Sequence, residues 1–258
     1  MTGTIDDARV SAAAALLLTA RRTRQWLAEL PDDARPRSEA EADAVQDAVA
    51  RRSGPLLAWK VGARTPTGTP FRGPIHAASV WPGPAVLPRD ALNVIGLEAE
   101  IAYRFDRDLP PCDATPYTEE EVYAAIGSIH PAIEIVDSRF TAYGATDALS
   151  HRADQMNHGA LIVGGGRRDW RAFTPVTQPV RLEIDGAEAK AGIGGNTAGD
   201  PLRLLVWLAN FGARTLGGIA AGQIVTTGSC TGTIFAKSGV SATASFPGLG
   251  AVSVTVEG

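Results

Sequence analysis

The chain has 258 residues, of which 45% are hydrophobic, so it can bury a large core in one domain or in one domain with a helical appendage. Its formal net charge of −4 gives no electrostatic reason to expect a nucleic acid or an anionic membrane as a partner. Cys112 and Cys230 are too few for a disulfide framework and lack zinc-site spacing, which fits a reduced cytoplasm and a small-molecule ligand.

The apolar run over residues 12–18 is too short to span a membrane. Two acids, Asp6 and Asp7, precede it and arginines follow it, which is the wrong order for a secretory signal. The run therefore predicts a folded helix, and its apolar spacing continues over residues 5–30 until Pro31.

A second helix is predicted to open at Ser38, where Glu41 completes the pattern of a capping box, and to end at the Ser-Gly-Pro of residues 53–55. Residues 1–54 are thus expected to be an N-terminal helical region that braces a core or an oligomer contact. Residues 55–258 are expected to form one β-rich catalytic core.

The hydrophobic period changes after Pro55, and residues 56–62, LLAWKVG, read as a buried strand with one charge, Lys60. Such a lysine is either a snorkelling or paired residue, or one whose surroundings tune it for proton transfer. Residues 65–84 are rich in Gly, Pro and Thr, and predict a loop long enough to act as a lid.

Two acids stand in the strand-like run of residues 96–105, GLEAEIAYRF, where Glu98 and Glu100 share a face because side chains two apart on a strand do so. A third, Glu134, stands in a similar run. Glu98 and Glu100 either belong, with Arg104, to a solvated sheet face, or are ligands of a hard divalent cation together with Glu134, which would relieve the mutual repulsion of the carboxylates.

Further acids and polar residues follow in chain order. The acids from Glu119 to Glu121 open a short helix and are expected to be structural. Residues 150–166 combine a polar loop with a strand that ends in three glycines, but they form no nucleotide-binding pattern. A hairpin turns at Asp185-Gly186, and Asp200-Pro201 starts a helix that reaches Leu216. Strands dominate without βαβ alternation, which predicts an α+β fold with largely antiparallel or mixed sheets.

Five segments in order, WKVG, LEAEIA, PAIEIVDSR, the D-x-x-x-x-G of residues 154–159 and GQIVTTGS at residues 222–229, resemble the 2-keto-4-pentenoate hydratase and 4-oxalocrotonate decarboxylase branch of the fumarylacetoacetate hydrolase superfamily. The resemblance covers nearly the whole chain. It implies an α+β fold with a helical N-terminal region and a mixed β-sheet roll, in a homo-oligomer. It also implies Mg²⁺ or Mn²⁺ held by Glu98, Glu100 and Glu134, with Asp137 as the competing third ligand or as a structural partner of Arg139.

The resemblance further assigns roles to individual residues. Lys60 matches the lysine beside the metal and is the leading candidate for proton transfer. Asp154 is retained from the family's Asp-Asn-Ala-Ser-Ser-Gly stretch, whereas Asn157 and His158 replace its small hydroxyl residues. The Gly228-Ser229 turn is expected near the substrate carboxylate, where backbone N–H groups could bind the anion.

One expected residue is absent. Hydratases of this branch commonly carry an acid in a Pro-Asp-Phe-Gly-like stretch, but residues 69–73 here read Thr-Pro-Phe-Arg-Gly. His76 or His158 could supply the proton in its place, or Lys60 could act alone. Arg72 could bind an additional substrate carboxylate, or could be a solvated loop arginine.

These features lead to three hypotheses. The first is a metal-dependent lyase of aromatic-compound catabolism acting on a 2-oxo or 2-hydroxydienoic acid, with hydration favoured over decarboxylation and with a pathway enzyme as a possible partner. The second is a C–C bond hydrolase. The third is a non-catalytic relative that binds a ligand or stabilises another enzyme.

Overall fold

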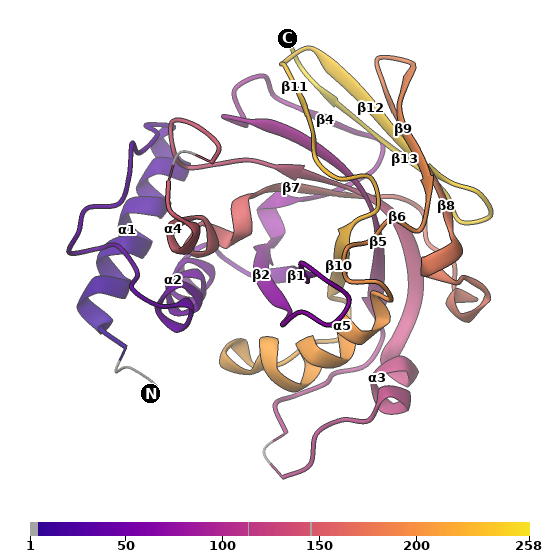
Figure 1. Cartoon of the computed structure of the whole chain (residues 1–258), viewed down its shortest axis with the longest axis horizontal. Helices are drawn as coiled ribbons and strands as arrows, with labels where there is room; N and C mark the ends of the chain where they lie inside the picture. The colour runs from indigo at the N-terminus through magenta and orange to yellow at the C-terminus, as the bar shows by residue number, and fades with distance from the viewer. Residues whose placement is uncertain (1–4, 113, 145) are drawn as a thin grey trace.

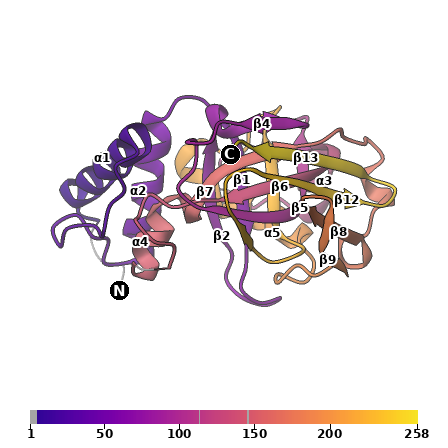
Figure 2. The same ribbon diagram turned by 90° about the horizontal axis from the view of Figure 1, so that it is seen from above.

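The computed structural model describes residues 5–112, 114–144 and 146–258. Within these ranges the strands form two mixed sheets, with a pair of N-terminal helices packed at one end of the molecule (Figures 1 and 2). The expected α+β fold with mixed sheets is confirmed. No helix in the described part of the chain is long and apolar enough to cross a membrane.

The larger sheet has the order β2-β1-β10-β5-β6-β7-β3 over the described residues, and β11 also pairs with β5. The long strands β5 and β6 are antiparallel neighbours in its centre, whereas β1 runs parallel to β10. Its strands are β1 Leu56–Gly62, β2 Phe71–His76, β3 Val80–Pro82, β5 Ile95–Phe105, β6 Ile126–Val136, β7 His158–Val163, β10 Ile224–Ser229 and β11 Ile234–Ala236.

The smaller sheet has the order β4-β13-β12-β8-β9. Apolar side chains of both sheets form one buried cluster, in which Leu97 and Ile133 of the larger sheet join Phe246 and Val254 of the smaller one. Its strands are β4 Ala85–Leu87, β8 Pro179–Ile184, β9 Ala187–Ile193, β12 Val240–Phe246 and β13 Gly250–Val256. The predicted hairpin is confirmed, since β8 and β9 meet at Asp185-Gly186, both with positive φ.

The helices lie at the periphery of the sheets (Figure 1). Helices α1 and α2 bury an apolar face of their own together with Phe140 and Ala153 from later in the chain. Just before α5, the Asp200 side chain accepts from the Leu202 amide, as expected of a residue that precedes a helix start. The helices are α1 Asp7–Thr23, α2 Glu39–Arg52, α3 Glu119–Ala125, α4 Ala148–Ala153 and α5 Leu202–Trp207, the last followed by short helical turns to Leu216.

The helix predicted over residues 5–30 is longer than the helix that forms, which is α1 alone. Helix α1 ends at Thr23 because Arg24 takes a left-handed backbone with φ 58° and caps the Ala20 carbonyl. The following chain turns toward the sheets, where Leu27 bridges to Phe140. At the second helix Ser38 caps the Glu41 amide as predicted, but the Glu41 carboxylate accepts from the Arg37 amide, so the box is not closed on Ser38 itself.

The prediction of a long lid over residues 65–84 is wrong. Strand β2 pairs antiparallel with β1, and β3 pairs parallel with β7, so two strands of the larger sheet run through the segment. One of the prolines that suggested a loop, Pro74, lies on an edge strand, where a missing N–H is tolerated. Gly73 is required there, because a Cβ would stand 2.9 Å from the Lys60 Cγ.

A buried ion pair joins the helical region to this sheet. Arg72 of β2 and Asp47 of α2 are 2.6 Å apart, and both side chains are almost fully buried. We expect Asp47→Ala to lower the free energy of unfolding by about 3–5 kcal/mol, because it leaves the Arg72 charge buried without its partner.

The matched control is Asp43→Ala on the same helix, since Asp43 pairs with Arg152 but is 29% exposed. Its expected cost is about 1 kcal/mol or less. Urea denaturation of both variants measures the difference, and equal midpoints would show that the buried pair contributes no more than a surface pair.

Candidate metal centre

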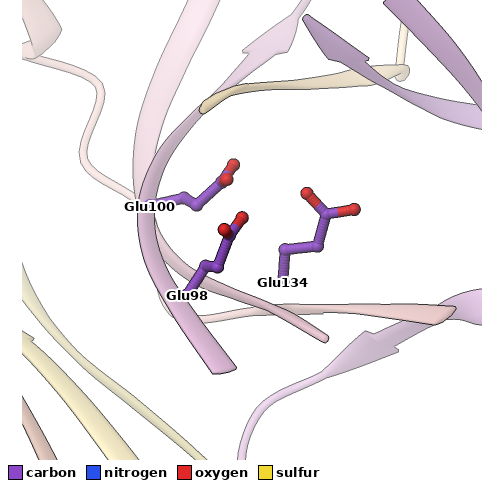
Figure 3. A group of neighbouring side chains, drawn as sticks. All are labelled: Glu98, Glu100 and Glu134. Carbon is purple, nitrogen blue, oxygen red and sulfur yellow. The ribbon is translucent and has the colours of Figure 1, made fainter. Parts of the chain in front are cut away.

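Three glutamates converge where β5 and β6 pair. The register sets Glu98 directly opposite Glu134, and Glu100 lies two residues along β5 on the same face. Figure 3 shows the three side chains pointing toward one another from the two strands. Each can offer one oxygen within 4.8 Å of the other two. Glu100 and Glu134 are only 1% exposed, so the alternative of a solvated sheet face is wrong for Glu100.

Hydroxyl and amide donors hold the two β5 carboxylates in place. Thr233 donates to Glu98 and Thr226 donates to Glu100, while the Gly228 amide also donates to Glu100 at 3.2 Å. The second oxygen of Glu100 is buried and has no hydrogen-bond partner among the described residues. A buried carboxylate oxygen without a partner is costly, and a cation would satisfy it.

The three carboxylates disfavour a fully ionised state. Burial and the Glu134 charge raise the pKa of Glu98, and burial with the Glu134 and Glu98 charges raises the pKa of Glu100 well above its ordinary value. Burial also raises the pKa of Glu134, against the opposing effect of Lys60. A divalent cation among them would offset this repulsion, and an all-carboxylate oxygen set is the kind that Mg²⁺ or Mn²⁺ prefers.

Lys60 of β1 completes the cluster. Its Nζ lies 2.5 Å from Glu134 Oε1 and 3.0 Å from the Met156 carbonyl oxygen. Burial by itself lowers the Lys60 pKa, but the three glutamates outweigh burial and the net shift is upward. Lys60 is therefore an ammonium in this state, which can donate a proton. It is paired with Glu134, as one of the two sequence interpretations expected.

A cavity of about 660 Å³ opens beside these side chains. Its lining includes Lys60 and the three glutamates, together with Phe71, Val136, Tyr143 and Asn157. Gly228 and Ser229, which the resemblance places near the substrate carboxylate, also line it. The Gly228 N–H already donates to Glu100, so this amide is not free to bind a substrate anion.

Asp154 and His158 lie behind the cavity rather than in its lining. The Asp154 carboxylate accepts from the Arg139 side chain at 2.6 Å, and Arg139 also pairs with Asp137 at 3.3 Å. These contacts give Asp137 the partner that the sequence interpretation assigned to it. His158 is fully buried, with Nδ1 at 3.0 Å from Glu134 and Nε2 at 3.0 Å from the Ser79 hydroxyl.

Burial, together with the Lys60 and Arg21 charges, holds the His158 pKa well below its ordinary value, so the imidazole is neutral. The tautomer with Nδ1–H donates to Glu134 and fixes the orientation of that carboxylate. His158 therefore contacts the cluster from behind, and the structure gives it no direct path to the cavity.

Two residues predicted to bind substrate point elsewhere. Arg72 is neither a cavity residue nor a solvated loop arginine, because it lies in β2 and its guanidinium pairs with Asp47 and stacks over Trp59. His76 is 8% exposed and lies at the far end of the same strand, where burial and nearby positive groups lower its pKa to about 3. The described cavity lining contains neither residue.

Several contacts were not found from the sequence. Thr226 and Thr233 hold the carboxylates, and Tyr143 and Asn196 line the cavity, yet the sequence interpretation gave none of the four a role in the site. The Thr-Thr-Gly of residues 226–228 was a usable signal, because hydroxyls followed by a glycine turn suit an anionic partner. The long loop containing Tyr143 carried no such signal.

Two mixed sheets that gather buried carboxylates and a lysine at the floor of an open cavity define an enzyme-type site for a hard cation and a small polar molecule. The fumarylacetoacetate (FAA) hydrolase C-terminal model matches residues 58–257. The chain therefore belongs to the fumarylacetoacetate hydrolase family.

Full-length relatives extend the similarity beyond that domain. A 2-keto-4-pentenoate hydratase of Paraburkholderia phymatum is 29% identical over 96% of this chain and 97% of its own length. A 4-oxalocrotonate decarboxylase of Pseudomonas putida is also 29% identical, over 77% of this chain and 74% of its own.

Among solved structures, 4-oxalocrotonate decarboxylase from Pseudomonas putida G7, complexed with magnesium and adipate, superposes with a TM-score of 0.85. It is 25% identical, and the match covers 98% of this chain and 99% of that one. The likeness therefore includes the N-terminal helices, which the family model does not cover.

Proposed function

We propose that the protein is a divalent-metal-dependent lyase that hydrates a 2-hydroxydienoate to a 4-hydroxy-2-oxo acid. The observation that carries the proposal is the set of three converging carboxylates, two of them buried and one of these with an unpartnered oxygen, which line a cavity together with Lys60. The named hydratase and decarboxylase relatives support it. Mg²⁺ is the proposed ion, with Mn²⁺ as the alternative.

Glu98, Glu100 and Glu134 are the residues that would hold the ion. When bound, it would polarise the C2 oxygen of a 2-oxo acid and stabilise negative charge there. The Lys60 ammonium would supply a proton on the face of the substrate that it meets, since one of its N–H groups is left after the bonds to Glu134 and Met156. Phe71, Val136 and Tyr143 would shield the carbon chain from water.

A second candidate function is decarboxylation of a 2-oxo-enedioate such as 4-oxalocrotonate. The observation that favours it is Lys190 of β9, a cation that lines the same cavity and has no ion pair with another described residue. An ammonium there suits a second substrate carboxylate, which the hydratase substrate lacks. The decarboxylase with a TM-score of 0.85 also agrees with this candidate.

The test is a spectrophotometric assay with freshly generated 2-hydroxypenta-2,4-dienoate. Protein treated with a chelator is expected to leave the dienol absorbance unchanged, and added Mg²⁺ or Mn²⁺ is expected to restore its decay, with a 4-hydroxy-2-oxo acid as the product by NMR. The same samples given 4-oxalocrotonate report CO₂ release.

The two reactions have distinct products, so the assay separates them. CO₂ release with little dienol decay would select decarboxylation. A third outcome is that calorimetry shows bound Mn²⁺ and bound ligand but neither compound is turned over. That outcome would contradict both reactions and leave the non-catalytic hypothesis. Release of a C–C cleavage product would select the hydrolase.

Four broader expectations are also proposals. We infer a homo-oligomer, contact with a pathway partner enzyme, a cytoplasmic location and a division into a helical region over residues 1–54 and a core over 55–258. The proposed boundary at residue 54 crosses one apolar cluster, because α1 and α2 pack against Phe140 and Ala153 of the core.

A further inference from the structure

A turn with unusual backbone lies directly behind Lys60. Gln155, Met156 and Asn157 all have left-handed φ, at 49°, 52° and 60°, and none of them is glycine. Left-handed backbone is uncommon for residues with a side chain, and three in succession persist only where their surroundings hold them. The contacts that hold this turn therefore indicate what it is for.

Gln155 makes the contacts that tie the turn down. Its side-chain Nε2 donates to the Pro74 carbonyl of β2 at 2.7 Å, and its Oε1 accepts from Arg21 of α1 at 2.9 Å. The residue is 1% exposed. Both ends of the buried amide are thus satisfied, one by the sheet and one by the N-terminal helix.

The position of this turn determines where the Lys60 ammonium lies. The Met156 carbonyl accepts from Lys60 Nζ at 3.0 Å, in addition to the contact of Nζ with Glu134 at 2.5 Å. Gly73, paired with Lys60 in the sheet, leaves no spare room, since a Cβ would stand 2.9 Å from both the Gln155 carbonyl and the Lys60 Cγ. The turn, the edge strand and the lysine stem therefore form one packed unit.

We propose that Gln155 is a positioning residue for Lys60. By joining the turn to β2 beside Lys60 and to Arg21 of α1, it fixes the Met156 carbonyl so that the ammonium is held between that oxygen and Glu134 and faces the cavity. The effect on turnover rests on the proposed function, whereas the effect on the lysine itself does not. The N-terminal helix thereby contributes to the geometry of the site through Arg21.

The test variant is Gln155→Met, which keeps the length of the side chain and removes both polar ends. Its matched control is Gln178→Met, another buried glutamine whose amide donates to a backbone carbonyl, that of Pro247 at 2.9 Å. We expect kcat to fall about a hundredfold in Gln155→Met, because a shift of about 1 Å in a catalytic group has that effect. The KM and the Mn²⁺ affinity should stay near the wild-type values, and Gln178→Met should keep its kcat.

A second readout needs no turnover. The three lysines of the chain, Lys60, Lys190 and Lys237, are acylated under limiting reagent and quantified by mass spectrometry. In Gln155→Met the labelling of Lys60 relative to the other two lysines should rise about tenfold. This is the change expected if the Lys60 ammonium loses its hydrogen bond to the Met156 carbonyl. Gln178→Met should leave the ratio unchanged.

If circular dichroism shows that Gln155→Met does not fold, Gln155→Glu is tested in its place. It keeps the acceptor for Arg21 but cannot donate to Pro74 when ionised, so an intermediate rise in Lys60 labelling is expected. Wild-type labelling ratios in the folded variants would overturn the proposal. If the wild-type protein turns over neither dienoate nor 4-oxalocrotonate, the proposed function fails, and the labelling ratio alone decides the role of Gln155.

Discussion

Glu100→Gln is expected to lose metal-dependent turnover by at least about a thousandfold, because a bound divalent ion supplies several kcal/mol of charge stabilisation that an amide ligand does not secure. The fold should survive, since the substitution removes one of three mutually repelling carboxylates from a buried cluster. Glu98→Gln should behave in the same way. Thermal denaturation without metal is expected to give a midpoint equal to or above that of the wild type.

Glu41→Gln is the matched control, because Glu41 is buried on α2 and accepts a backbone N–H that an amide oxygen can also accept. Turnover, Mn²⁺ affinity by calorimetry and the melting midpoint are measured on all variants. Unaltered Mn²⁺ affinity or full activity in Glu100→Gln would remove the carboxylate cluster from the mechanism.

Lys60→Met is expected to lower kcat by on the order of a hundredfold or more while metal still binds, because a positioned proton donor contributes about that much. The substitution also leaves Glu134 buried without the ammonium that now lies 2.5 Å away. The apoprotein should therefore be destabilised, and added Mn²⁺ should raise its melting midpoint by more than it raises that of the wild type.

Lys237→Met, at an exposed position outside the cluster, controls for loss of a positive charge. An unchanged kcat in Lys60→Met would reduce Lys60 to a structural partner of Glu134. A lost Mn²⁺ affinity would instead show that Lys60 is needed to assemble the carboxylates.

The strands that carry the cluster were predictable because their local signals agree. Glu98, Glu100 and Glu134 interrupt apolar runs, and their strand period of two fixes which side chains share a face. The same reasoning could not find the Arg72–Asp47 pair, because it depends on contact between α2 and β2. An arginine among glycines and prolines reads as a loop residue until its strand partner is known.

The segment at residues 65–84 shows why glycine and proline can mislead. In β2 they do not break the strand, since Pro74 lies on the edge of the sheet and Gly73 makes room for Lys60. Likewise, Asp154 was assigned to the site because it matches the family pattern, and His158 because it could replace the missing loop acid. What the sequence could not reveal is that His158 contacts Glu134 from outside the cavity lining, whereas Asp154 pairs with Arg139.

The pairing of Glu98 with Glu134 across β5 and β6 makes metal affinity a reporter of strand register. A slip of one residue along this ladder would turn Glu134 to the opposite face of the sheet and leave the two β5 carboxylates without their third partner. In a refolding experiment, tight Mn²⁺ binding should therefore appear only in molecules whose central ladder has closed correctly. The far-ultraviolet circular dichroism signal depends on strand content and not on strand register, so it should recover before Mn²⁺ binding does.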